Sequence, residues 1–149
     1  MANQPRTRSA DTADGYSLDD QIGFILRKVS QRHTAIFAAA FGSDLTAPQW
    51  ATLAKLYESG ATSQNQLGRL VALDAATIKG VVDRLGARGF ITTSPDPDDA
   101  RRVLVTLTDA GRKEAERGFP IAAAITEETL SALDNTQRAQ LIALLKALG

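Results

Sequence analysis

Two short amphipathic helices separated by very few residues constrain the fold of this chain more than any other feature. Ser63 and Gln66 have the spacing of a helix-capping box, and an apolar face follows at Leu67, Leu70 and Val71. Only Ala72 and Leu73 then precede Asp74, a second capping residue. After it comes a stripe with i, i+3, i+4 and i+7 spacing, formed by Ile78, Val81, Val82 and Leu85. The sequence therefore predicts two capped helices joined by a tight turn, the second ended by Gly89.

A β-hairpin is predicted directly after these helices. Residues 90–94 and 102–107 are rich in β-branched side chains and partly alternate in polarity. The segment 95–101 between them is rich in Pro and Asp, which is typical of a turn. Two helices followed by a hairpin is the order of a winged helix-turn-helix, whose second helix enters the DNA major groove. We expect a mainly α fold with a small β-hairpin wing.

The N-terminal part of the chain is predicted to form a tail and two further helices. Residues 1–16 are polar and lack apolar periodicity, which predicts a mobile tail. Apolar side chains recur at three- and four-residue spacing over about 17–41, which predicts a helix with an apolar stripe. Thr46 and Gln49 form a capping box at the start of the next helix, and Gly60 ends it.

Two more helices are predicted at the C-terminal end. Thr108 caps a helix that continues to about 131, with a kink at Pro120. Asp134 and Gln137 form another capping box, and the helix after it is rich in leucine, at Leu141, Leu144, Leu145 and Leu148. We expect a single domain over 17–149, in which 17–41 and 109–149 flank a winged helix-turn-helix over 46–108.

Composition excludes several classes of function. The chain has no Cys and one His, which excludes disulfides, Cys nucleophiles and zinc centres built from several Cys or His ligands. No apolar run approaches the roughly 20 residues of a membrane span, and the N-terminus has no apolar signal segment, so we expect a cytoplasmic protein without membrane contact. The net charge is zero, with 17 basic and 17 acidic residues, which argues against a nonspecific polyanion binder.

Basic residues nevertheless gather in the middle of the chain. Residues 62–113 hold eight basic and six acidic side chains, and three of the acids, Asp96, Asp98 and Asp99, crowd into one loop. Those three carboxylates lack the spacing of a calcium loop and are flanked by Pro and Arg, so a solvated turn is the favoured interpretation. There is no Gly-rich phosphate loop and no plausible Ser/His/Asp set. We therefore expect no enzyme activity, no metal and no cofactor.

The second helix of the pair carries the predicted base contacts. Small side chains at 75, 76 and 80 allow close approach to base edges, and Ala76 lies on the exposed face. Lys79 can reach a guanine edge or a phosphate, and Thr77 can bond a base or pack on a thymine methyl. Arg84 and Arg88, nearer the far end, are expected to meet phosphates.

Two further pairs of residues complete the predicted DNA surface. Ser63 and Gln64 begin the first helix of the pair, where free backbone N–H groups favour a phosphate. Arg101 and Arg102 stand where the hairpin would reach a minor groove, which attracts arginine. The alternative is that these segments are two solvated helices and an exposed turn without a nucleic-acid partner.

Three motifs resemble the MarR (multiple-antibiotic-resistance regulator) family. The run from Asp99 to Gly111 is similar to the family's wing, D-x-R-x-x-x-V-x-L-T-x-x-G. Residues 81–90 resemble the end of the family's recognition helix, and residues 45–53 the start of its second helix. The resemblance covers roughly 18–148 in the right order. One departure is Ala100, which replaces the first of two arginines that many members have after the wing Asp.

The resemblance implies a homodimer bound to double-stranded DNA. In such a dimer the helices over 17–41 and 109–149 of both chains pack together, and each winged unit contacts one half-site. The terminal helices support this independently, because their apolar stripes are longer than one small core can bury. A two-fold dimer would bind a pseudo-palindromic operator with half-sites about one helical turn apart.

An effector site is a further expectation. Five of the eight aromatic residues fall between Phe24 and Tyr57, in a stretch that also holds the predicted ligand-binding residues Arg27, His33, Phe37 and Trp50. Such a cluster can hold a small aromatic acid, with rings stacked and the carboxylate on Arg or His. The alternative is an aromatic core with a simply hydrogen-bonded histidine. The resemblance favours the ligand, because many members bind aromatic acids. The chain as a whole resembles the family's nicotinate-catabolism repressors, which respond to 6-hydroxynicotinate.

The sequence thus predicts a dimeric, sequence-specific transcriptional regulator that binds DNA. The favoured form is a repressor that a small aromatic acid releases from its operator. The rival from another class is a helical interaction module or adaptor without DNA specificity of its own. Heparin retention and a shift of promoter DNA discriminate between the two, because only a DNA-binding dimer should show both.

Overall fold

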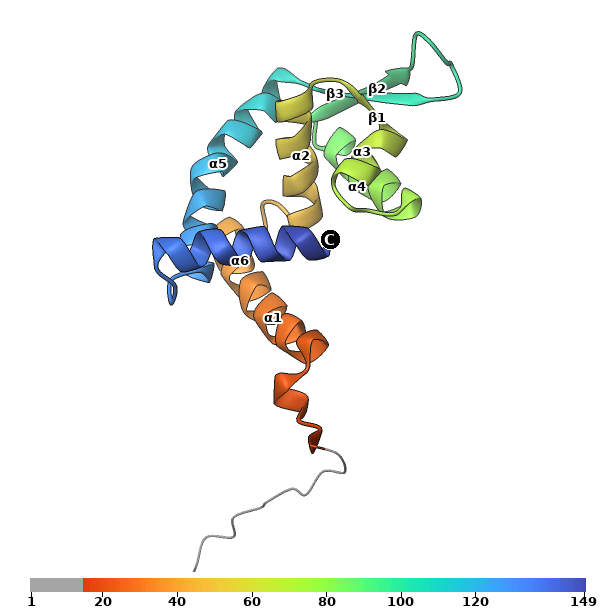
Figure 1. Cartoon of the computed structure of the whole chain (residues 1–149). Helices are drawn as coiled ribbons and strands as arrows, with labels where there is room; N and C mark the ends of the chain where they lie inside the picture. Colours follow the sequence, from red (N-terminus) through yellow and green to blue (C-terminus); the bar gives the residue numbers. More distant parts are fainter. Residues whose placement is uncertain (1–14) are drawn as a thin grey trace, which may run out of the picture.

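The computed structural model describes residues 15–149, which form six α-helices and one small sheet (Figure 1). The helices are α1 (Ile22–Phe41), α2 (Ala47–Ser59), α3 (Gln64–Leu70), α4 (Ala75–Ala87), α5 (Asp109–Thr129) and α6 (Asn135–Leu148). The strands are β1 (Thr62–Ser63), β2 (Ile91–Pro95) and β3 (Val103–Leu107). The mainly helical fold with a small wing is confirmed, and the predicted tail over 1–16 falls almost entirely outside the described residues.

Helix starts follow the capping residues. The hydroxyl of Thr46 accepts a bond from the backbone N–H of Gln49, whose side chain bonds back to the Thr46 backbone. The same reciprocal box opens α6, from Asp134 and Gln137. Single side-chain caps open α4 and α5, from Asp74 and Thr108. These bonds span three residues, so each start is set locally.

Two predicted details at helix starts are wrong. The first helix begins at Ile22 and not near 17, because residues 18–20 form a short 3-10 helix and Gln21 is extended. The box expected at Ser63 is only half formed. Ser63 accepts from the backbone of Gln66, but the Gln66 side-chain oxygen accepts from Arg69 instead of reaching back.

The turn between α3 and α4 closes in a left-handed step. Ala72 has φ 56°, and its N–H donates to the Arg69 carbonyl, while the N–H of Leu73 donates to the carbonyl of Gly68. This bonding pattern is a Schellman motif, with Ala72 at the position that usually holds glycine. The motif turns the chain within two residues, so α4 can pack directly across α3.

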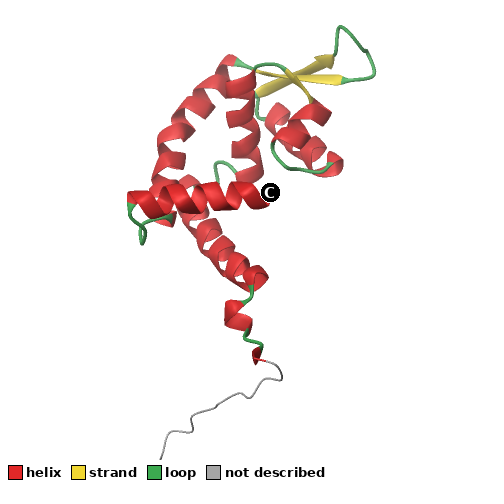
Figure 2. Ribbon diagram, viewed as in Figure 1, coloured by secondary structure: helices red, strands yellow, loops and turns green. Residues whose placement is uncertain are grey.

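A three-stranded antiparallel sheet borders the helix pair (Figure 2). The strand order is β1-β3-β2, with Thr62 opposite Val105 and Ile91 opposite Leu107. Strand β1 is only two residues long, and the hairpin pattern did not predict it. The core beneath the sheet joins α2, α3, α4 and β3 through fully buried side chains, namely Leu53, Leu56, Leu67, Ile78, Leu85 and Val105.

The terminal helices leave apolar surface uncovered. α5 packs against α1 and α2, whereas α1 extends away from the winged unit (Figure 1). Only Ile36 and Phe41 of α1 are buried, and large apolar side chains of α1 and α6 are exposed, among them Ile22, Val29, Leu144 and Leu148. Within residues 15–149 no helix combines the length and apolarity needed to cross a bilayer.

Candidate nucleic-acid interface and effector hollow

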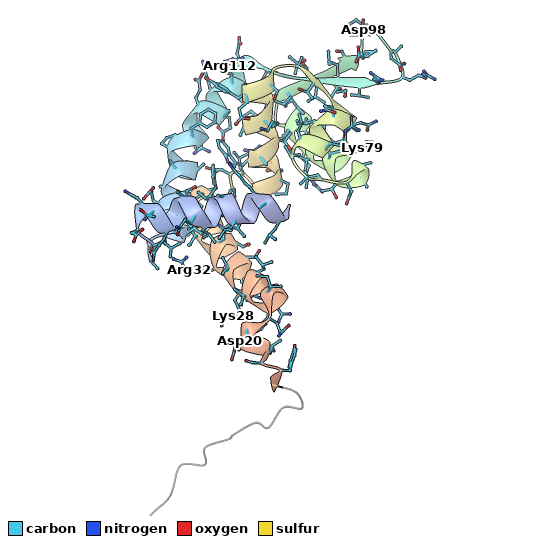
Figure 3. All side chains as sticks on the ribbon, in the orientation of Figure 1. Asp20, Lys28, Arg32, Lys79, Asp98 and Arg112 are labelled. Carbon is cyan, nitrogen blue, oxygen red and sulfur yellow. The ribbon has the colours of Figure 1, made fainter. Side chains whose placement is uncertain are left out.

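The outer face of α4 presents polar and small side chains. Ala76, Thr77 and Lys79 are exposed, while the apolar stripe of the same helix points into the core. The ammonium of Lys79 lies 2.7 Å from the carboxylate of Asp83, with both side chains more than half exposed. Figure 3 shows Lys79 on the outer side of the helix. An exposed pair of this kind is weak, so Lys79 can exchange Asp83 for another anion at little cost.

Two other α4 residues are held by their own helix. The pKa of Asp74 lies below its usual value because the backbone N–H and then the hydroxyl of Thr77 bond its carboxylate. Thr77 is therefore fixed at the N-terminus of α4. The Arg84 guanidinium lies back along the helix, 3.5 Å from where a Cβ on Gly80 would stand. Arg84 thus lies against Gly80, one of the small residues that the sequence predicted to approach base edges.

Asp99 organises the arginine side of the loop between β2 and β3. Its carboxylate accepts from the backbone N–H and the Nε of Arg101, at 3.0 and 3.2 Å, and lies 3.7 Å from Nε of Arg102. The side-chain bond from Arg101, followed by the backbone bond, holds the pKa of Asp99 below its usual value. The Arg101 side chain is 92% exposed, so its guanidinium is open to solvent while its Nε and backbone N–H are bonded to Asp99.

The acidic loop at the tip of the wing is a built turn. The N–H of Asp98 donates to the side chain of Asp96, and the N–H of Asp96 donates to the carbonyl of Arg102. Figure 3 shows Asp98 at the outer end of the loop. These bonds are the ones expected of the predicted solvated turn.

A hollow of about 580 Å³ lies between α3 and the wing. Its walls include four of the predicted DNA contacts, two at the start of α3 and two in the wing: Ser63, Gln64, Arg101 and Arg102. The structure adds Arg69, which the sequence reasoning missed. Its Nε and Nη2 donate to the side-chain oxygen of Gln66 at 3.2 and 2.7 Å. A neutral amide thus orients Arg69 without cancelling its charge.

Arg88, expected at a phosphate, is exposed but makes its contacts with residues of its own chain. Its guanidinium donates to the backbone carbonyl of Asp44 and lies 4.8 Å from the ring centre of Phe90. It therefore ties the end of α4 to the loop before α2, and this contact accounts for its position without DNA.

A second hollow, of about 360 Å³, lies between α1 and the first turn of α2. His33 and Phe37 line it, together with Thr34 and Ala38 of α1 and the residues leading into α2: Gly42, Leu45, Thr46, Ala47 and Pro48. Its walls are mostly apolar, and His33 is the one side chain of this lining that can carry charge. Its Nδ1 lies 2.9 Å from the hydroxyl of Thr129.

The other two predicted ligand residues lie outside this lining. Arg27 stands over the ring of Phe24, 5.5 Å from its centre, near the start of α1. Trp50 is part of an aromatic row that the core hypothesis anticipated. Its ring centre lies 5.3 Å from that of Phe41 and 5.5 Å from that of Phe119. Within the single chain, His33 and Phe37 therefore line the same hollow. Arg27 and Trp50 lie outside its lining.

The chain matches known proteins along most of its length. The model of the MarR family matches residues 45–103. NicR, an HTH-type transcriptional repressor of Pseudomonas putida, is 41% identical over 132 residues, which are 88% of this chain and 84% of NicR. A solved structure of a probable transcriptional regulator from Pseudomonas aeruginosa is 53% identical, with a TM-score of 0.85 over 89% of this chain and all of that one.

A further similar structure comes from a regulator whose DNA binding responds to a small acid. It is BpsR of Bordetella bronchiseptica, solved to explain how 6-hydroxynicotinic acid regulates its DNA binding. It is 40% identical, with a TM-score of 0.87 over 89% of this chain and 96% of BpsR. The order of helices, the three-stranded wing and the near-complete coverage of NicR all agree with the resemblance in the three sequence motifs. The chain belongs to the MarR family of transcriptional regulators.

Proposed function

We propose that this chain is a homodimeric, sequence-specific repressor that leaves a pseudo-palindromic operator when it binds a small aromatic acid. The hollow between α3 and the wing carries the DNA half of the proposal. Three arginines line this hollow, Arg69, Arg101 and Arg102, and none of its lining residues is acidic. Asp99 pairs with Arg101 and Arg102 from the loop beside it, so positive charge is in excess. A concave surface with excess arginine attracts a phosphate backbone.

The elements around that hollow define how DNA would lie. α4 enters the major groove with Ala76, Thr77 and Lys79 toward the base edges and Arg84 toward the backbone. The backbone between the grooves then passes through the hollow, against Ser63, Gln64 and Arg69. The exposed guanidinium of Arg101 continues into the minor groove, with Arg102 beside it.

A second copy would cover the apolar faces of the terminal helices. Large apolar side chains of α1 and α6 are exposed, among them Ile22, Val29, Leu144 and Leu148, and contiguous apolar surface of this kind marks protein–protein contacts. Deletion of residues 134–149 should therefore abolish the dimer or cause aggregation, as measured by sedimentation velocity. A soluble, DNA-binding dimer without α6 would show that the dimer forms elsewhere.

The hollow between α1 and α2 is the proposed effector site. An aromatic ring would pack on Phe37, which stacks on Phe41, and its carboxylate would meet His33. Trp50 lies beyond Phe41, with its ring tilted against that of Phe41. Arg27 of the same chain lies outside the lining, so it joins the site only from the second subunit. The similarity to BpsR, whose DNA binding 6-hydroxynicotinic acid regulates, supports 6-hydroxynicotinate as the acid.

Release from DNA would follow a shift in population. The acid binds better to the conformation in which the two α4 helices are misplaced for successive major grooves. Because α2 forms part of the hollow and of the winged core, filling the hollow would move the winged unit relative to α1, which carries part of the proposed dimer contact.

A mobility-shift titration tests the whole proposal. The protein should retard DNA from upstream of its own gene, and 6-hydroxynicotinate should reverse the shift, whereas 6-hydroxynicotinamide, which lacks the carboxylate, should not. Absence of any sequence-preferring shift would favour the adaptor without DNA specificity. A shift that neither compound reverses would remove the acid effector and leave the DNA-binding function.

A further inference from the structure

The imidazole of His33 is positioned by a residue from the far end of another helix. His33 is exposed on α1, so packing alone does not fix its ring. Its Nδ1 lies 2.9 Å from the hydroxyl oxygen of Thr129, the last residue of α5. With Nδ1 in that bond, Nε2 is the ring nitrogen left for a ligand in the hollow that His33 lines.

Thr129 is itself held in place by Arg32, which directly precedes His33 on α1. Arg32 donates through Nη1 to the carbonyl of Thr129 at 2.7 Å and through Nη2 to the carbonyl of Glu128 at 2.9 Å. These carbonyls end α5, where backbone acceptors lack partners within the helix and the helix dipole favours a cation. Figure 3 shows Arg32 on α1 in this region. Two consecutive residues of α1 thus bind the same helix end.

A hydroxyl suits this position better than a fixed donor or acceptor. A threonine O–H can donate to Nδ1 of a neutral ring, or its oxygen can accept from Nδ1–H of a charged ring. In both states Nε2 can carry a proton toward an acid in the hollow. Thr129 therefore keeps the ring in one orientation whether or not the imidazole is charged.

We propose that Thr129 is a positioning residue of the effector hollow, which orients His33 so that Nε2–H donates to the carboxylate of the bound acid. The inference rests on the proposed effector function and adds to it a residue about one hundred positions further along the chain, on the helix that ends beside α1. It also assigns Arg32 to the support of Thr129 rather than to the ligand.

The experiment compares three variants of the full-length protein. Thr129→Val removes the hydroxyl while keeping the shape, and Thr129→Ser keeps the hydroxyl. Thr126→Val is the matched control, because Thr126 lies one turn earlier on α5 and its hydroxyl donates to the carbonyl of Ala122. Calorimetric titration with 6-hydroxynicotinate should show about three- to tenfold weaker binding for Thr129→Val and near wild-type binding for the other two.

A spectroscopic signature separates positioning from a merely structural role. The chain has one histidine, so its imidazole 15N signals need no assignment between residues. Without ligand, Thr129→Val should shift both nitrogen signals, whereas Thr126→Val should leave them unchanged. Added 6-hydroxynicotinate should move Nε2 of the wild type more than Nδ1.

The outcomes distinguish this inference from the function on which it rests. Imidazole signals of Thr129→Val identical to those of the wild type would overturn the positioning role. Equal weakening by Thr129→Ser and Thr129→Val would overturn it as well, because the hydroxyl would then not matter. A wild type that binds no 6-hydroxynicotinate would overturn the effector proposal itself, even with the hydroxyl-dependent signals present.

Discussion

The indole of Trp50 lies directly on the backbone of Gly118. A Cβ built on Gly118 would stand 2.1 Å from Cζ3 of the indole, well inside any real contact. Gly118 is in the middle of α5 and Trp50 is on α2, so this contact sets how closely α5 approaches α2. The absence of a side chain at residue 118 is therefore a packing requirement and not a matter of backbone freedom.

Replacing Gly118 with alanine should destabilise the fold. The added methyl must displace Trp50 or bend α5, and overpacking of this kind costs about 1–3 kcal/mol of unfolding free energy. Chemical denaturation followed by circular dichroism measures the loss. Gly86→Ala is the matched control, because Gly86 is also helical but has open space around its Cβ position. That variant should gain up to about 1 kcal/mol from helix propensity, and equal effects of the two substitutions would contradict the packing argument.

Replacing Ala72 with glycine should stabilise the protein. Ala72 adopts φ 56° at the end of α3, a conformation that costs an L-residue with a Cβ about 1–2 kcal/mol. Part of that gain is lost to the greater freedom of glycine in the unfolded chain, so we expect a net gain of about 0.5–1 kcal/mol. Thermal unfolding measures it, and Ala76→Gly, at a helical position, should change stability in the opposite direction. A loss of stability in Ala72→Gly would show that this turn carries no strain.

Replacing Arg101 with alanine should weaken DNA binding and its salt dependence. The guanidinium proposed for the minor groove brings one positive charge into the DNA interface, so its removal should make the slope of log affinity against log salt shallower by about one unit. Fluorescence anisotropy at several salt concentrations gives the slope. Arg101→Lys keeps the charge, so it should retain most of the wild-type slope. An Arg101→Ala dimer with wild-type affinity and slope would refute the wing contact.

Replacing His33 with alanine should raise the effector concentration that releases DNA, with operator affinity little changed. The loss of one charge-assisted hydrogen bond costs about 1.5–3 kcal/mol, or roughly ten- to hundredfold in affinity. Competition between 6-hydroxynicotinate and labelled operator measures both quantities. If His33→Ala unfolds the protein while the folded fraction responds normally to the acid, the histidine is structural and the effector binds elsewhere.

The elements that the sequence alone predicted are those whose boundaries are set by residues close by in the chain. Thr46, Asp74, Thr108 and Asp134 each cap a helix through a bond to a backbone N–H three residues on, so the signal lies within a few positions. β1 escaped prediction because it has only two residues, and its partner β3 lies about forty positions later. Such a strand has no periodicity to detect.

The site residues that sequence reasoning missed or misplaced depend on contacts between distant parts of the chain. Arg69 is one exposed cation on α3, and it gains meaning only from Arg101 and Arg102, which the sheet brings to the same hollow. Arg27 and His33 are six residues apart, a spacing that places side chains on different faces of a helix, and the structure separates them. Helical spacing also could not decide whether Trp50 faces a ligand or the core, since both are apolar surroundings.

The apolar stripe of α1 shows a different limit. Ile22 and Val29 recur at core-like spacing, yet they are 62% and 52% exposed in one chain. A hydrophobic pattern records that a face is buried but not by which molecule, so burial by a second copy produces the same sequence signal as burial within the chain.

The capping box of Thr46 and Gln49 has a consequence for regulation. Thr46, Ala47 and Pro48 line the hollow, while the same helix carries Leu53 and Leu56 in the winged core. One helix therefore reaches from the proposed effector hollow into the winged core. Through it, the binding free energies of the proposed effector and of the operator would be linked. By thermodynamic reciprocity, if an acid bound in the hollow lowers the affinity for the operator by some factor, the bound operator lowers the affinity for that acid by the same factor. The repressor on its operator would then respond only at higher effector concentrations than the free repressor in the same cell.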